Sequence, residues 1–221
     1  MFPPATLTFL RALKRNNDRE WFRARKDEYD RVVRAPMVAM IERLAVDFRA
    51  FAPELSASPK VSLYRIYRDT RFSDNKTPLK THVAAVFPDL RLGKHQGAAL
   101  YLHVSPKDVW IGGGLYGPDT SQLHAEREHI AANHRRLRSI VESPSFVRAV
   151  GELEGEKLQR VPRGFDANHP AVEYLKFRQF LAGCEYPASF ATSPQFYAGM
   201  LKVFRAIAPL VKFLNEPLVG R

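Results

Sequence analysis

Cationic side chains are concentrated in one short segment of this chain. Between Arg65 and His82 the sequence reads Arg-Ile-Tyr-Arg-Asp-Thr-Arg-Phe-Ser-Asp-Asn-Lys-Thr-Pro-Leu-Lys-Thr-His, with Asp69 and Asp74 as its acids. Cations this close repel one another by roughly 1 kcal/mol per pair at 4 Å in water, and by more when they are half buried. An anionic ligand would offset this repulsion, so the segment is the first candidate for a binding site.

The residue types of this segment suit phosphate or carboxylate groups. Arginine binds both groups bidentately and lysine adds a point charge, while the backbone N–H groups of a Ser-Asp-Asn turn can form an anion nest. We therefore predict an anionic small molecule as the partner. The predicted ligand-binding residues are Arg65, Arg68, Asp69, Arg71, Ser73, Lys76 and Lys80, with Arg127 contributing from another part of the chain.

The same residues are open to other interpretations. Arg65, Asp69 and Arg71 can instead form an internal salt-bridge network, as arginine and carboxylate groups commonly do. A single-stranded nucleic acid is a second possibility, since aromatic residues accompany the cations, namely Tyr64, Tyr67, Phe72 and Tyr101. It is not favoured, because no nucleic-acid-binding fold motif is present. A third is a non-catalytic interaction protein whose basic loop docks an acidic partner.

No reaction follows from these residues, so enzymatic activity is left open. His82 is the best acid–base candidate because it follows the cationic segment, although a lone histidine beside a strand is usually structural. No metal or cofactor is expected. His124, His129 and His134 lie five residues apart, which places them about 140° apart around a helix, so they cannot share one metal ion. Gly112-Gly-Gly114 lacks the Gly-Lys-Ser/Thr ending of a P-loop and predicts a close backbone approach instead.

Composition sets broader limits on the protein. Its 221 residues carry a formal net charge of +11, but the basic residues are spread along the whole length, so the local cluster is the more informative feature. Cys184 is the sole cysteine, which excludes an internal disulfide and predicts a reducing, cytoplasmic location. The start resembles no signal peptide, and no apolar run reaches the roughly 18 residues of a membrane span, so no membrane partner is expected.

Periodicity predicts the elements that position the cationic segment. Apolar residues recur with helical spacing in the first quarter, at Thr6–Lys14, Asp18–Arg34 and Met37–Phe51. Runs rich in β-branched and aromatic residues predict four strands, at Val61–Tyr67, His82–Phe87, Ala98–Val104 and Val109–Leu115. The turn Ser105-Pro-Lys-Asp108 predicts a hairpin between the last two.

The second half is predicted to be helical. We expect a long helix capped by Asp119 or Ser121 and a helix over Pro144–Leu153. A strand-like segment or loop over Glu154–Phe165 and two final helices follow, the first ending near Cys184. The predicted fold is therefore one compact α+β domain over residues 1–221. It has a mixed, mainly antiparallel sheet flanked by N- and C-terminal helices.

Several separated motifs resemble one protein family. They are Asn16-Asn17, Glu20-Trp21-Phe22, Tyr64-Arg65, Arg68-Asp69-Thr-Arg-Phe-Ser73, Lys76-Thr-Pro78, Lys80-Thr81, Gly112-Gly-Gly114, Arg127, Leu158 with Arg160, Pro162-Arg-Gly164, His169-Pro170 and Leu175-Lys176. In this order they resemble the bacterial and fungal family catalogued as domain of unknown function 2461, over nearly the whole chain. The resemblance implies no activity. Asn75 and Leu79 depart from it, standing where an acid and an aromatic residue are expected, so no role for a carboxylate or phenol can be carried over there.

Overall fold

The computed structural model describes residues 1–71 and 74–220, and it is an α+β protein with helices at both ends. The helical elements are α1 (Pro4–Arg15), α2 (Arg19–Arg23), α3 (Lys26–Tyr29), a π-helical segment η1 (Asp30–Arg34), α4 (Ala35–Phe48), α5 (Pro59–Ser62), α6 (Thr120–Ala132), α7 (His134–Val141), α8 (Pro144–Val150), α9 (Val172–Leu175), a 3-10 segment η2 (Ala188–Thr192) and α10 (Phe196–Asn215). The strands are β1 (Val83–Pro88), β2 (Ala99–Val104), β3 (Asp108–Leu115) and β4 (Phe180–Pro187).

Short polar side chains begin several of these helices. The Asp18 carboxylate accepts hydrogen bonds from the backbone N–H groups of Glu20 and Trp21, at 2.8 and 2.9 Å. Asp119 forms a reciprocal capping box with Gln122 at the start of α6, as its sequence position predicts. Ser143 caps α8 in a similar way. These caps satisfy backbone donors that a helix start leaves without intrahelical partners.

The strands form one antiparallel sheet in the described part of the chain, with the order β1-β2-β3-β4. The β2–β3 hairpin turns at Ser105, whose N–H donates to the Asp108 carbonyl at 2.8 Å. In the registers of the pairs, Val83 faces Val104 and His103 faces Trp110. The three strands predicted between residues 82 and 115 and their hairpin are therefore confirmed.

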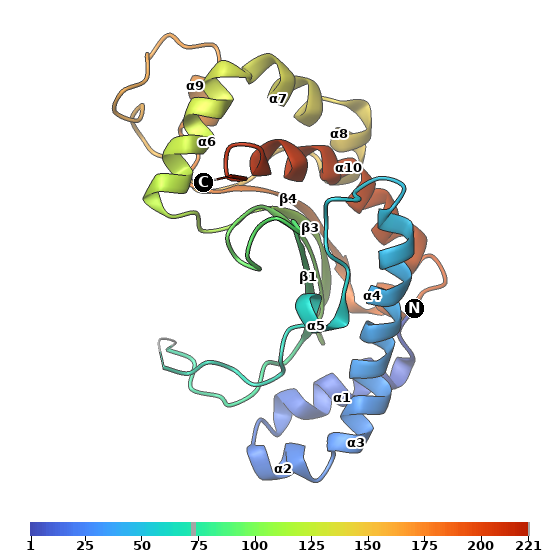
Figure 1. Cartoon of the computed structure of the whole chain (residues 1–221). Helices are drawn as coiled ribbons and strands as arrows, with labels where there is room; N and C mark the ends of the chain where they lie inside the picture. Colours follow the sequence, from blue (N-terminus) through green and yellow to red (C-terminus); the bar gives the residue numbers. More distant parts are fainter. Residues whose placement is uncertain (72–73, 221) are drawn as a thin grey trace.

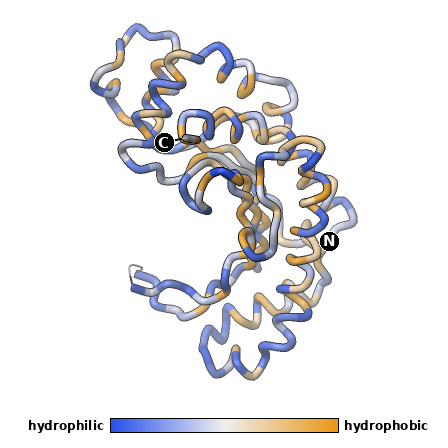
Figure 2. The backbone as a smooth tube through the Cα atoms, viewed as in Figure 1, coloured by the Kyte–Doolittle hydropathy of each residue, from blue (hydrophilic) through white to orange (hydrophobic). Residues whose placement is uncertain are grey.

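Helix α10 packs on one face of the sheet and defines the core (Figures 1 and 2). Strand side chains alternate between the two faces, so every second residue of β2 faces α10. Those residues are Leu100, Leu102 and Val104, and all are fully buried. Buried residues from α1, α4, the sheet and α10 belong to one continuous cluster.

The second face of the sheet has a different composition. It carries Tyr101 and His103 from β2, Trp110 and Gly112 from β3, and Gly183 from β4. The two β2 side chains and the indole are only partly buried. This second face carries polar and aromatic side chains, whereas the α10 face is apolar.

Two predicted elements are wrong. The run Val61–Tyr67 is not a strand: Ser58 and Pro59 start the short helix α5, and only isolated bridges follow, from Leu63 to Ala85 and from Tyr67 to Leu79. A proline at the first helical position is pre-organised for a helix, and this local signal outweighed the β-branched residues. The segment that ends near Cys184 is strand β4 rather than a helix, because it pairs with β3 along its whole length.

Glycines let the backbones of β3 and β4 approach closely. Gly114 has a φ of 132°, and a Cβ placed on it would lie 2.0 Å from the Phe180 carbonyl oxygen. A Cβ on Gly112 would lie 2.4 Å from the Ala182 carbonyl oxygen. The triple glycine thus provides the close backbone approach that its sequence predicts.

We predict that Gly114→Ala lowers the free energy of unfolding by more than the roughly 1–3 kcal/mol of a strained φ angle, since a backbone collision is added. Gly117→Ala is the matched control: its φ is 58° and nothing lies within 4 Å of the added Cβ. It should lose only about 1–2 kcal/mol. Urea denaturation measures the free energy of unfolding of both variants. Equal decreases would contradict the prediction, because they would show that the backbone relieves the collision at Gly114 without a cost in stability.

The continuous core also predicts how the chain responds to proteases. We expect limited proteolysis to leave one resistant unit, because buried residues from both ends of the chain share one cluster. Early cuts should fall in exposed loops. Gel electrophoresis and mass spectrometry identify the products. Two stable fragments separated near residue 55 or residue 118 would contradict a single domain.

Candidate functional site

The cationic segment is attached to the N-terminal helices through Asn17. Its side-chain amide donates to the Leu79 carbonyl at 2.9 Å, and its amide oxygen accepts from the Leu79 N–H at 3.0 Å. The segment closes on itself through two backbone bonds, from Lys80 to Ile66 and from Arg68 to Pro78. The ring of Tyr67 packs edge-on against Phe22. Figure 1 shows the segment extending from α5 past α1 and α2.

The outer part of the segment holds its charges in local contacts. Arg71 binds Asp69 at 2.8 Å, and Arg65 lies 3.9 Å from the same carboxylate. The hydrogen bonds with Arg71 hold the pKa of Asp69 well below its usual range. The ammonium group of Lys76 donates to the Thr70 carbonyl at 3.0 Å. In this outer part, Arg65, Asp69 and Arg71 form the salt-bridge network that was the alternative to a binding site, and they lie at an exposed turn. Ser73 and Phe72 lie outside the described residues.

The inner part of the segment brings cations together around Tyr64. The Lys80 ammonium lies 4.8 Å from the centre of the Tyr64 ring, and the Lys94 ammonium lies 4.4 Å from it. His95 stacks on the same ring, with 5.8 Å between the ring centres. Lys94 and His95 come from the β1–β2 loop, and Tyr64 follows α5. We call Tyr64, Arg68, Lys80, Lys94 and His95 the basic cluster.

The charges of the basic cluster repel one another. Burial lowers the pKa of Lys80, and the positive charges of Arg65, Arg68 and Lys94 lower it further. Burial also lowers the pKa values of Lys94 and His95. Among the described residues, no carboxylate lies within salt-bridge distance of Lys80, Lys94 or Arg68. The Nε of Arg68 is buried and has no hydrogen-bond partner in the part of the chain that the structure describes.

Aromatic rings continue from the basic cluster across the second face of the sheet. Tyr64 contacts Tyr101 with 6.3 Å between ring centres, and Tyr101 contacts Trp110 at 5.7 Å. His103 lies 5.7 Å from Tyr101, and His82 lies 5.4 Å from His103. We call Tyr64, Tyr101, Trp110, His103 and His82 the aromatic row.

The two histidines of this row differ in their surroundings. His103 Nε2 lies 3.1 Å from the Asp108 carboxylate, which also accepts from Ser105 Oγ at 2.7 Å. The serine thus contacts the carboxylate rather than the imidazole, which is not the order of a catalytic triad. Burial, with the charges of His103, Lys80 and Arg68, lowers the pKa of His82 to about 4. His82 is therefore neutral at pH 7.

Arg127 is not brought to the cationic segment. Its guanidinium donates to the carbonyls of Leu175 and Phe177, at 2.9 and 3.3 Å, so it holds the loop after α9 against α6. It also lines a hollow of about 390 Å³ with His124, Glu156 and Arg178.

The remaining histidines and the cysteine also have separate surroundings. The three histidines near α6 have different neighbours: His124 lies by Glu128, His129 by Glu216 and His134 by His169. Cys184 lies in β4, and burial raises the pKa of its thiol. The described residues contain no group of three or more metal-ligating side chains placed to hold an ion.

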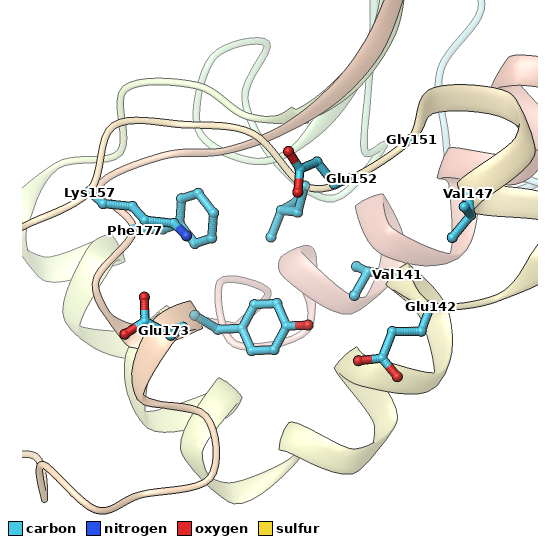
Figure 3. Close-up of a pocket in the computed structure, with 10 residues that line it drawn as sticks. Val141, Glu142, Val147, Gly151, Glu152, Lys157, Glu173 and Phe177 are labelled. Atoms are coloured by element: carbon cyan, nitrogen blue, oxygen red, sulfur yellow. The ribbon is translucent and has the colours of Figure 1, made fainter.

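Two further hollows lie near α8. One, of about 370 Å³, is lined by acidic, aromatic and aliphatic side chains, including Glu142, Glu173 and Tyr174 (Figure 3). Glu173 is paired with Lys176, and Glu142 with Arg138. The other, of about 440 Å³, lies between α8 and α10. Neither hollow is lined by a residue of the basic cluster.

Three residues of this region were not predicted from the sequence as candidate site residues, namely Lys94, His95 and Trp110. A signal for two of them was present, since Gly93-Lys-His-Gln-Gly97 joins two predicted antiparallel strands and presents two basic residues at one end of the sheet. No sequence signal places Trp110, because its position depends on the register between β3 and β4.

Together, the fold and site define a class: α+β proteins with a C-terminal helix on one sheet face and basic and aromatic groups on the other. The model of the family described as conserved hypothetical protein, DUF2461, matches residues 5–213, so the chain belongs to that family. No curated protein and no solved structure matches the chain. No helix of the described residues is both long and apolar enough to cross a membrane.

The environment of His82 predicts its titration. Its pKa in the folded protein, about 4, lies below the 6.5 of an unperturbed histidine. The unfolded chain therefore binds more protons between these values, so stability is full above about pH 6.5 and falls as the pH drops towards 4. NMR of the imidazole carbons should show His82 titrating near pH 4. A midpoint near 6.5 would contradict the buried, cation-flanked environment.

Proposed function

We propose that this protein binds a small molecule bearing a phosphate or carboxylate group, and that the basic cluster holds that group. The observation that carries the proposal is the placement of two lysine ammonium groups, one from each side of β1 in the sequence, over the one ring of Tyr64. A cation over an aromatic ring gains roughly 0.5–1 kcal/mol when exposed and about 2 when desolvated. Tyr64 thus holds two like charges near one another, but it does not neutralise them.

An anion would supply what the basic cluster lacks. The guanidinium of Arg68 has a buried donor without a partner, and an unsatisfied buried donor costs about 1–3 kcal/mol. Lysine and arginine bind phosphate and carboxylate oxygens strongly, because the donor carries a positive charge and the acceptor a negative one. A ligand oxygen near Arg68, Lys80 and Lys94 would accept a hydrogen bond from the Arg68 Nε and would also reduce the repulsion among the three positive charges.

The proposed site contains only some of the ligand-binding residues that were predicted from the sequence. Arg68 and Lys80 remain in the proposed site, and Lys94 and His95 join them. Asp69, Arg71 and Lys76 are engaged in contacts within the exposed turn, and Arg65 adds positive charge from the side of Asp69. Arg127 supports a separate loop. The expected compartment remains the cytoplasm, on the ground of the single cysteine.

Thermal unfolding tests the proposal with Lys80→Met and Lys94→Met, which keep the apolar stem and remove the charge. At low salt we would add phosphate, pyrophosphate, sugar phosphates, nucleotides and dicarboxylates one at a time. A ligand at 100 times its Kd adds about 2.7 kcal/mol to the stability of the folded state. For a chain of this size the wild-type midpoint should rise by roughly 5 to 10 °C, and each variant should lose most of that shift.

The unliganded variants separate a binding site from a structural brace. Because the folded state lowers the pKa of Lys80, it disfavours the charged form, so removing the charge should leave the unliganded midpoint unchanged or higher. Lys76→Met is the matched control from the same segment and should respond to anions as the wild type does. The proposal fails if no anion shifts the wild type, or if Lys80→Met lowers the unliganded midpoint by several degrees.

A further inference from the structure

We infer that the bound anion carries a flat ring, as a nucleotide does, and that Trp110 and Tyr101 receive the ring while the basic cluster holds the phosphate. This inference deepens the proposed function and rests on it. Its starting point is the position of the Trp110 indole on the second face of the sheet.

Two paired glycines place the indole flat on the sheet. Gly112 of β3 and Gly183 of β4 lie directly opposite each other. A Cβ on Gly112 would lie 2.5 Å from the Trp110 ring, and a Cβ on Gly183 would lie equally close, at 2.5 Å. Any larger residue at either position would therefore lift the ring off the backbone. The sheet covers one side of the indole, and the other side faces away from it.

The outer side of the indole is available to a ligand. Trp110 is only partly buried, although it lies in an inner strand of the sheet. Among the described residues its one ring contact is with Tyr101, inclined at 55° rather than stacked. A tryptophan in a sheet normally completes a hydrophobic core, but the core of this protein lies on the α10 face. A partly exposed flat ring can stack on a nucleic-acid base, since every base has a π face.

The aromatic row joins this ring to the cations. Tyr101 contacts Trp110 on one side and Tyr64 on the other, and Tyr64 carries both lysines. A ligand lying along the row would meet rings at one end and positive charge at the other. A nucleotide has this distribution, a neutral planar base joined by a sugar to a phosphate. Inorganic phosphate, sugar phosphates and aliphatic dicarboxylates have only the charged part.

Intrinsic fluorescence reports directly on the inferred contact. The chain has two tryptophans, so Trp21→Phe leaves Trp110 as the single tryptophan, which can be excited selectively at wavelengths where tyrosine does not absorb. We would titrate this protein with AMP, ribose 5-phosphate, inorganic phosphate and adenosine at low salt. AMP should quench Trp110 and bind roughly five- to hundred-fold more tightly than ribose 5-phosphate, the range expected for one stacked base. Ribose 5-phosphate and phosphate should bind without quenching.

Substitution then tests the two ends of the site separately. Trp110→Leu should reduce AMP affinity to that of ribose 5-phosphate while leaving phosphate binding unchanged. Lys80→Met should weaken AMP, ribose 5-phosphate and phosphate alike. Because loss of the indole can disturb the sheet, far-UV circular dichroism checks the fold, and quenching in the Trp110-containing protein remains decisive if Trp110→Leu does not fold.

The outcomes distinguish this inference from the proposed function. If phosphate binds through Lys80 but AMP gains nothing over ribose 5-phosphate and does not quench Trp110, the ring inference is wrong and anion binding stands. If no phosphate compound binds, the ring inference is wrong, and the proposed function then stands only if a dicarboxylate binds through Lys80.

A single-stranded hexanucleotide without a terminal phosphate distinguishes a free nucleotide from a nucleotide within a nucleic-acid strand as the ligand. We expect it to bind more weakly than AMP, because the cations are gathered at one end of the row. Tighter binding that falls steeply with salt would instead assign the ring and phosphate contacts to a nucleic-acid strand.

Discussion

The packing of α10 against one face of the sheet determines which side chains lie on the other face. Because strand residues alternate between faces, covering one face with an apolar helix commits Leu100, Leu102 and Val104 to the core. Tyr101 and His103, the residues between them, must then lie on the opposite face. The helix that stabilises the fold thus also exposes a surface of rings and histidines, although α10 itself contributes no residue to that surface.

The positive charges of the basic cluster destabilise one another. Lys80, Lys94 and Arg68 are partly buried near one another, and the described residues offer them no carboxylate. Contacts with the Tyr64 ring offset only part of this cost. A cation–π contact contributes about 0.5–2 kcal/mol, whereas removing a charge from water costs several kcal/mol. Strain of this kind persists where the surrounding structure is strong enough to hold it, and here the buried core supplies that support.

The cationic segment itself illustrates how tertiary contacts divide neighbouring residues. Arg71 and Arg68 are three positions apart, yet Arg71 pairs with Asp69 at an exposed turn while the Nε of Arg68 is buried beside the sheet. Asn17 anchors the segment near this division, because its side-chain amide bonds both backbone groups of Leu79. That contact spans 62 positions in the sequence. Lys80, the residue after Leu79, lies over the Tyr64 ring, whereas Lys76 donates to the Thr70 carbonyl within the turn.

Local patterns in the sequence determined much of this protein. Helical periodicity, the caps at Asp18 and Asp119, the hairpin turn at Ser105 and three of the strands are properties of short stretches, and the family motifs are likewise local. The sequence alone also located a concentration of positive charge between Arg65 and Lys80. Tertiary structure decided the rest. Strand β4 exists because β3 pairs with it, and Trp110 lies flat because Gly112 meets Gly183 across that pair. Lys94 reaches Tyr64 because a loop 30 residues further along the chain folds back over the same ring. Such contacts depend on register and packing between distant segments, and no short stretch of sequence contains that information.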